Sequence, residues 1–123
     1  MPATEIQHPY QGHAESVVIS SGASLSATVN CGGRTMVSIR MPATWTAANL
    51  TFQASEAEGG TYGDLYDDVG TEYLVTAAAA RWIALAPVAF AGPPFLKIRS
   101  GTAGAPVNQA AARTLVILFR EID

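Results

Sequence analysis

The strongest constraint on the fold of this chain is how closely its turn residues are spaced. Glycine, proline and aspartate divide the 123 residues into short segments, several of which alternate between apolar and polar residues. In residues 49–55, Leu50, Phe52 and Ala54 fall on one face of such a segment. A period of two is typical of half-buried strands. Nine segments are predicted to be strands, namely residues 16–20, 25–29, 34–41, 49–55, 61–66, 72–76, 81–85, 95–100 and 114–120.

The number and length of these segments predict the fold class. About eight or nine short strands with turns between them favour an all-β fold, a single β-sandwich of jelly-roll type. Residues 114–120 are almost continuously apolar, which fits a central strand or a strand with a second covered face. Six apolar side chains are predicted to face the core: Leu50, Phe52, Leu96, Ile98, Leu115 and Ile117.

Little of the chain has helical character. Residues 77–80 and 109–112 have helix-forming composition but are too short to nucleate a helix alone, and residues 42–46 can form a single turn. Residues 1–14 have no periodicity, and we interpret them as an N-terminal arm. The sandwich domain is then expected to span residues 15–123.

Composition argues against several functional classes. The formal net charge is −3 and there is no basic run, so no nucleic-acid partner is expected. Cys31 is the only cysteine, which excludes an intramolecular disulfide and a zinc site built from several thiolates. The first residues do not resemble a signal peptide, and the weakly polar residues 75–91 are interrupted by Arg81 and Pro87. We therefore expect synthesis in a cytoplasm and no membrane partner.

The sequence also argues against an enzyme. It contains no Gly-x-Ser-x-Gly nucleophile motif, and its two histidines, His8 and His13, both lie in the predicted arm. An arm is a poor place to hold a general base within hydrogen-bond reach of a nucleophile. No cofactor is expected either, because no glycine-rich loop lies between a strand and a helix.

The densest group of charged residues is acidic. Asp64, Asp67 and Asp68 could supply oxygen ligands to a calcium ion, with Glu72 nearby. Their spacing does not match the helix-loop-helix calcium motif, and aspartate is common in turns. We therefore favour turn formation and predict no metal site.

Five aromatic residues raise the possibility of a carbohydrate-binding surface. Such a surface requires several rings on one exposed face. We favour placing them in the core or in a subunit interface, where aromatic residues are enriched. The five are Trp45, Tyr62, Tyr66, Tyr73 and Trp82.

Several segments resemble a known class of proteins. Residues 50–55 (LTFQAS), 64–72 (DLYDDVGTE), 96–102 (LKIRSGT) and 105–109 (APVNQ) are similar to segments of small accessory virion proteins encoded by tailed bacteriophages. The similarity covers roughly residues 16–120. It implies a structural subunit on the particle surface, a capsid decoration or cement protein bound to the major capsid protein, in a virion assembled in the host bacterial cytoplasm. A tail or baseplate component belongs to the same class, and a carbohydrate-binding or adhesion module is the alternative from another class.

Two expectations concern how such a subunit associates. Only 14% of residues are charged, which favours faces covered by a neighbour, and we predict self-association as a trimer. Within the arm, Ile6, Pro9 and Tyr10 are candidate anchors for a groove on a partner, since extended segments often bind by adding to a sheet edge.

Overall fold

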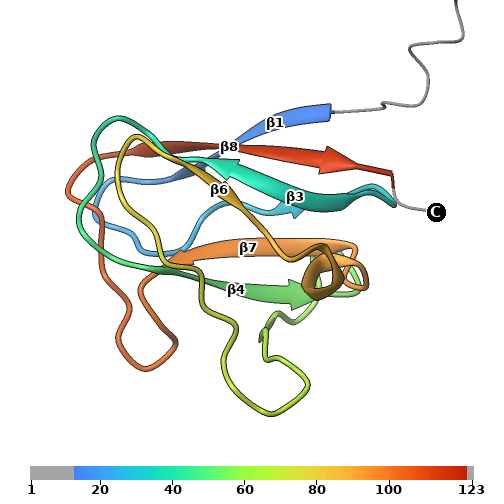
Figure 1. Ribbon diagram of the computed structural model, residues 1–123. Helices are drawn as coiled ribbons and strands as arrows, with labels where there is room; N and C mark the ends of the chain where they lie inside the picture. The colour runs from blue at the N-terminus through green and yellow to red at the C-terminus, as the bar shows by residue number, and fades with distance from the viewer. Residues whose placement is uncertain (1–12, 122–123) are drawn as a thin grey trace, which may run out of the picture.

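A computed structural model, which describes residues 13–121, shows two packed antiparallel sheets (Figure 1). One sheet has the strand order β1-β8-β3-β6 and the other has the order β2-β7-β4-β5. The strands are β1 (His13–Ile19), β2 (Val29–Asn30), β3 (Thr35–Arg40), β4 (Leu50–Ser55), β5 (Gly63–Asp64), β6 (Trp82–Ala84), β7 (Phe95–Ser100) and β8 (Arg113–Arg120), and a short 3-10 helix, η2 (Pro87–Phe90), follows β6.

The order of pairing is that of a jelly roll. The first strand pairs with the eighth, the second with the seventh, the third with the sixth and the fourth with the fifth, always antiparallel. The chain is thus one long hairpin rolled into two sheets, with β3 also pairing with β8 and β4 with β7. The predicted all-β sandwich of about eight strands is confirmed.

The core lies between the two sheets. All six side chains predicted to face it are completely buried. Phe90, from η2, adds to them and meets the ring of Phe52 edge-on, with centroids 4.9 Å apart. The prediction succeeds because β4, β7 and β8 each present alternate residues to the facing sheet.

Several predicted strands are shorter than expected. Residues 25–29 form isolated bridges at Leu25 and Ser26 and join a ladder only at Val29. Residues 61–66 reduce to the two-residue β5 and a bridge at Tyr66, and residues 72–76 to bridges at Glu72 and Val75. Each of these segments pairs with a neighbouring strand for only one or two residues.

The expected helical stretches are irregular. Residues 42–46 and 109–112 form bends, and residues 77–80 end in a turn with Ala80 in the left-handed region at φ 57°. The side chain of Gln109 is fully buried and bonds to Thr46, Ser100 and Arg113. These side-chain hydrogen bonds replace the backbone bonds that a helix would have made.

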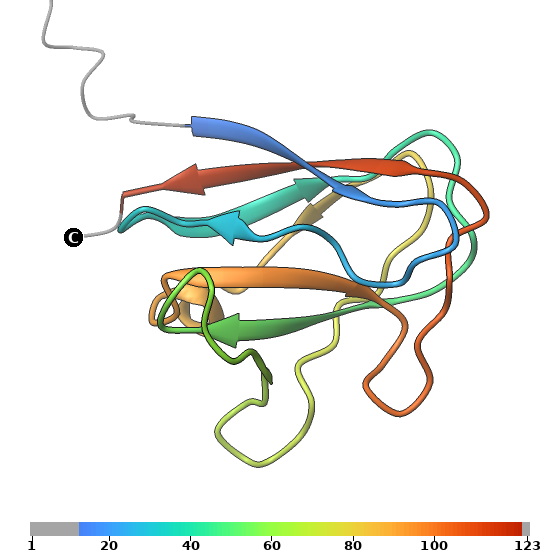
Figure 2. The ribbon, with the colours of Figure 1, turned by 180° about the vertical axis from the view of Figure 1, so that it is seen from behind.

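The first sheet begins inside the predicted arm. His13 and Ala14 belong to β1, where they pair with Phe119 and Leu118 of β8. The start of β1 and the end of β8 therefore lie at the same end of the sandwich, as the two views show (Figures 1 and 2). Residues 1–12, with His8, Ile6, Pro9 and Tyr10, lie outside the described residues.

Candidate functional site

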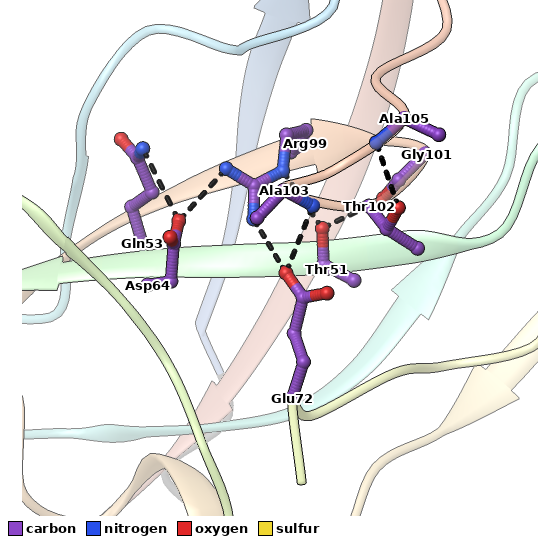
Figure 3. A network of polar contacts seen from close by, with 9 residues as sticks. All are labelled: Thr51, Gln53, Asp64, Glu72, Arg99, Gly101, Thr102, Ala103 and Ala105. Atoms are coloured by element: carbon purple, nitrogen blue, oxygen red, sulfur yellow. Dashed lines mark hydrogen bonds and ion pairs between the residues drawn. The ribbon is translucent and has the colours of Figure 1, made fainter.

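Arg99 is the centre of the most connected polar network in the described part of the chain (Figure 3). The alternation of residues 95–100 places Arg99 on the polar face, yet its side chain is only 7% exposed. Its Nη1 lies 2.9 Å from Asp64 Oδ1 and its Nη2 lies 2.7 Å from Glu72 Oε2. Its Nε donates to Thr51 Oγ1 on the neighbouring strand β4, at 2.9 Å.

The same network anchors two loops to one sheet. Glu72 Oε2 also accepts a hydrogen bond from the backbone N–H of Ala103 at 3.0 Å. Thr51 Oγ1 donates to the carbonyl of Gly101 at 2.7 Å. The hydrogen bonds that Arg99 and Glu72 make are charge-assisted, and such bonds are stronger than those between neutral groups. They fold residues 64–72 and 101–105 over the outer face of β4 and β7, which explains the burial of Arg99.

The three candidate calcium ligands have separate roles. Asp64 pairs with Arg99, as described above. Asp67 Oδ1 accepts hydrogen bonds from the backbone N–H groups of Val69 and Thr71, at 3.0 and 2.9 Å, and so shapes the turn. The side chain of Asp68 is exposed. Across residues 13–121, no three His, Cys, Asp or Glu side chains gather as metal ligands would.

A shallow groove lies beside this loop. It has a volume of about 340 Å³ and is bounded on one side by η2 and on the other by the 66–73 segment. Tyr66 is 53% exposed at its rim, and Val88 is 85% exposed. The groove is lined by Tyr66, Asp67, Asp68, Tyr73, Ala86, Val88 and Ala89, and we call it the acidic groove.

A basic patch lies at the start of β6. Trp82 is 62% exposed, and the guanidinium carbon of Arg40 lies 5.9 Å from the centre of its ring. Arg81 lines the same hollow, which has a volume of about 250 Å³. We call Arg40, Arg81 and Trp82 the basic patch. The expectation for Trp82 is the core or a subunit interface, and the structure excludes the core, because Ile83 takes the inward position of this three-residue edge strand.

The other aromatic residues do not share one face with Trp82. Trp45 packs partly against the core and its Nε1–H donates to the carbonyl of Ala48. Tyr62 lies beneath the ammonium group of Lys97, 4.5 Å from its ring centre. Tyr66 and Tyr73 both line the acidic groove. The five rings therefore do not form a common stacking platform for a sugar.

The outer face of the β1-β8-β3-β6 sheet is almost uncharged. The register aligns its residues in rows across the strands, so that Arg40 stands between Val116 and Trp82. Arg40 is the only charged residue in these rows, and Arg120, the next outward residue of β8 after Leu118, adds a second exposed charge to the face. The members of the rows are Ala14, Leu118, Ser38 and Ala84 in one row, Ser16, Val116, Arg40 and Trp82 in the next, and Val18 and Thr114 in the third.

Neither His13 nor Cys31, the histidine and the cysteine within residues 13–121, is placed for nucleophilic catalysis. His13 Nε2 lies 2.9 Å from Glu15 at the exposed start of β1. Cys31 is buried, and its burial raises the pKa of the thiol to about 11, so the thiol is protonated at neutral pH. Neither residue provides an activated nucleophile.

Comparisons with family models, curated proteins and solved structures give no match to this chain. Among residues 13–121, no helix has the length and apolar character needed to cross a membrane. The assignment of function therefore depends on the surfaces described above.

Proposed function

We propose that the chain is an accessory virion protein of a tailed bacteriophage, a decoration protein that binds the major capsid protein on the assembled shell. The observation that carries the proposal is the outer face of the β1-β8-β3-β6 sheet. Half-buried Val116 and Leu118 lie at its centre, and its charges among the described residues are Arg40 and, at the end of β8, Arg120. A face depleted of charge, with apolar residues at its centre, has the composition of a protein interface.

The size of this face fits a repeated contact. Strands about 4.8 Å apart, with alternate residues about 6.8 Å apart, give ten outward residues a flat area of about 330 Å². Stable pairwise interfaces bury about 800 Å² on each partner. A single contact through this face is therefore weak, whereas many copies on one lattice gain by avidity.

The fold and the resemblance agree with this role. Jelly rolls are common in viral capsid domains, and they also occur in lectins. Fold alone does not assign function. The segments that resemble phage virion proteins include residues 64–72 and 96–102, which contribute Asp64, Glu72 and Arg99 to the buried network. The resemblance thus includes residues that hold the loops in place.

The test is binding of the purified chain to heads and tails of the phage that encodes it, prepared without the protein. We expect saturable binding to heads, quantified as copies per particle by mass spectrometry. Val116→Lys with Leu118→Lys should abolish it, because two lysines would place charge at the apolar centre of the face. Val69→Lys, an exposed position on the 66–70 turn, is the matched control and should bind normally.

Three outcomes would overturn the proposal in part or whole. Binding to tails alone would reject the shell as partner while keeping a virion role. Binding of a glycan from a sugar panel, without binding to either particle, would favour the carbohydrate-binding alternative. Unaltered head binding by the double lysine variant, with its fold verified by circular dichroism, would reject the proposed face.

A further inference from the structure

We infer that copies of this chain associate by docking the basic patch of one copy into the acidic groove of the next. Trp82 and Arg81 enter the groove between Tyr66 and Val88, and Arg81 faces Asp67 and Asp68. This contact joins copies to one another and does not depend on the virion role. It shares Arg40 and Trp82, at the β6 edge, with the face proposed to bind the shell, whereas Arg81 and the acidic groove lie outside that face.

The basic patch differs from the other cations with described contacts in its exposure. Lys97 lies over the Tyr62 ring, and Arg113 is buried and bonded to Gln109 and Thr46. Arg34 pairs with Glu15, and Arg99 pairs with Asp64 and Glu72. Arg40 and Arg81, in contrast, have no carboxylate of residues 13–121 within ion-pair distance, although the whole chain is acidic. Two exposed arginines beside an exposed tryptophan are complementary to an acidic partner surface with an apolar pocket.

The acidic groove offers the complementary chemistry. One oxygen of Asp67 is held by backbone N–H groups, which fixes the carboxylate at the groove. Asp68 is exposed, and no cation of the described residues pairs with it. Tyr66 and Val88 supply apolar walls, and the volume of about 340 Å³ accommodates an indole ring.

The residue types also match those that dominate binding energy in interfaces. Tryptophan, tyrosine and arginine are enriched among the residues whose truncation costs most. Indole burial supplies the apolar contribution, and the Arg81–aspartate pairing sets orientation. When the patch of each copy binds the groove of the next copy around an axis, the contact is heterologous, and its repetition can close a ring such as the expected trimer.

The experiment is sedimentation analysis of the full chain over a range of concentrations, using a charge swap. Arg81→Glu alone and Asp68→Lys alone should each weaken association by about tenfold or more, since each places like charges together. The double variant Arg81→Glu with Asp68→Lys restores opposite charges and should recover most of the association. Glu56→Lys, an exposed acidic position elsewhere, is the control and should behave as the wild type.

Circular dichroism and thermal midpoints establish that every variant is folded. Trp82→Ala should also weaken association. Higher salt should weaken the association of the wild type, and Trp82→Ala should weaken it further at the same salt concentration. A wild type that is monomeric at all concentrations would overturn the inference. So would association unaffected by Arg81→Glu, or two weakened single variants whose combination recovers nothing.

Discussion

At the scale of single residues, Arg99 is the polar side chain on which the most structure depends. Its guanidinium joins β4, β7 and two loops through Thr51, Asp64 and Glu72. Removing it would leave two partly buried carboxylates close together with no countercharge. A paired charge that loses its partner costs more than the pair contributes.

Arg99→Met should lower the free energy of unfolding by about 2–4 kcal/mol, because Asp64 and Glu72 lose their countercharge while the hydrophobic stem is retained. Chemical denaturation measures this. Adding Asp64→Asn and Glu72→Gln should recover part of the loss by removing the stranded charges. Arg81→Met provides an exposed arginine for comparison and should change stability little. A small effect of Arg99→Met would show that the network is dispensable.

Cys31 should make stability fall at high pH. Burial raises the pKa of its thiol from 9.0 to about 11. Between these values the unfolded chain releases a proton that the folded chain retains, so stability is complete below about pH 9 and is lost as pH rises through about 11. The loss between pH 8 and pH 10.5 should be about 1–2 kcal/mol. Denaturation of wild type and Cys31→Ala at both pH values measures it, and equal pH dependence in the two proteins would contradict this account.

At the scale of elements, the sequence predicts strands best where pairing is long. Residues 95–100 and 114–120 alternate, or are apolar throughout, and both form full strands. Residues 25–29, with similar composition, do not, because pairing depends on a neighbour that lies elsewhere in the chain. The Arg99 network cannot be predicted from the sequence for the same reason. Arg99 is 35 residues from Asp64 and 27 from Glu72, and no local pattern reports such distances.

The acidic groove and the basic patch show even more clearly what the sequence alone does not predict. Tyr66, Asp67 and Asp68 are visible in the sequence as a turn with acidic and aromatic residues. That Val88 forms the opposite wall follows only from the position of η2, which no sequence pattern predicted. Alternation correctly indicated two-faced strands, but it could not show that the three-residue β6 directs Trp82 outward.

The loop after β7 depends on a glycine that no other residue can replace. Gly101 has φ +92°, and a Cβ there would lie 2.6 Å from the carbonyl oxygen of Ala105. Gly101→Ala should therefore destabilise the fold by about 2–4 kcal/mol, from backbone strain and steric overlap. Gly104→Ala, in the same loop with open space at its Cβ, is the control. Thermal and chemical unfolding compare them, and equal stability of the two variants would show that the loop moves freely.

At the scale of the whole molecule, the sandwich described by residues 13–121 has a complete core of its own. The predicted anchors Ile6, Pro9 and Tyr10 lie before it. Since His13 pairs with Phe119, the part of the arm that can be removed without disturbing β1 ends at residue 12. Arm and sandwich are thus separable in an experiment.

Deletion of residues 2–12 should leave the thermal midpoint of the sandwich unchanged and reduce its occupancy on the particle. The physical reason is that the described core consists of residues from 17 to 119, whereas Ile6, Pro9 and Tyr10 are suited to fill pockets on a neighbouring subunit. Differential scanning fluorimetry and the copy number per particle measure the two effects. Unchanged occupancy would show that binding comes from the sandwich alone.

The nested pairing of the strands also governs when the chain can fold. β8 lies between β1 and β3, so β1 cannot pair within the sheet until β8, the last strand of the sandwich, has been synthesised. At roughly 5–20 residues per second, this wait lasts about 5–20 s. Closing so distant a contact is slow after release as well. Throughout synthesis, the edges that β8 will later cover stay open to strands of other nascent chains, so aggregation should compete with folding most strongly on crowded polysomes.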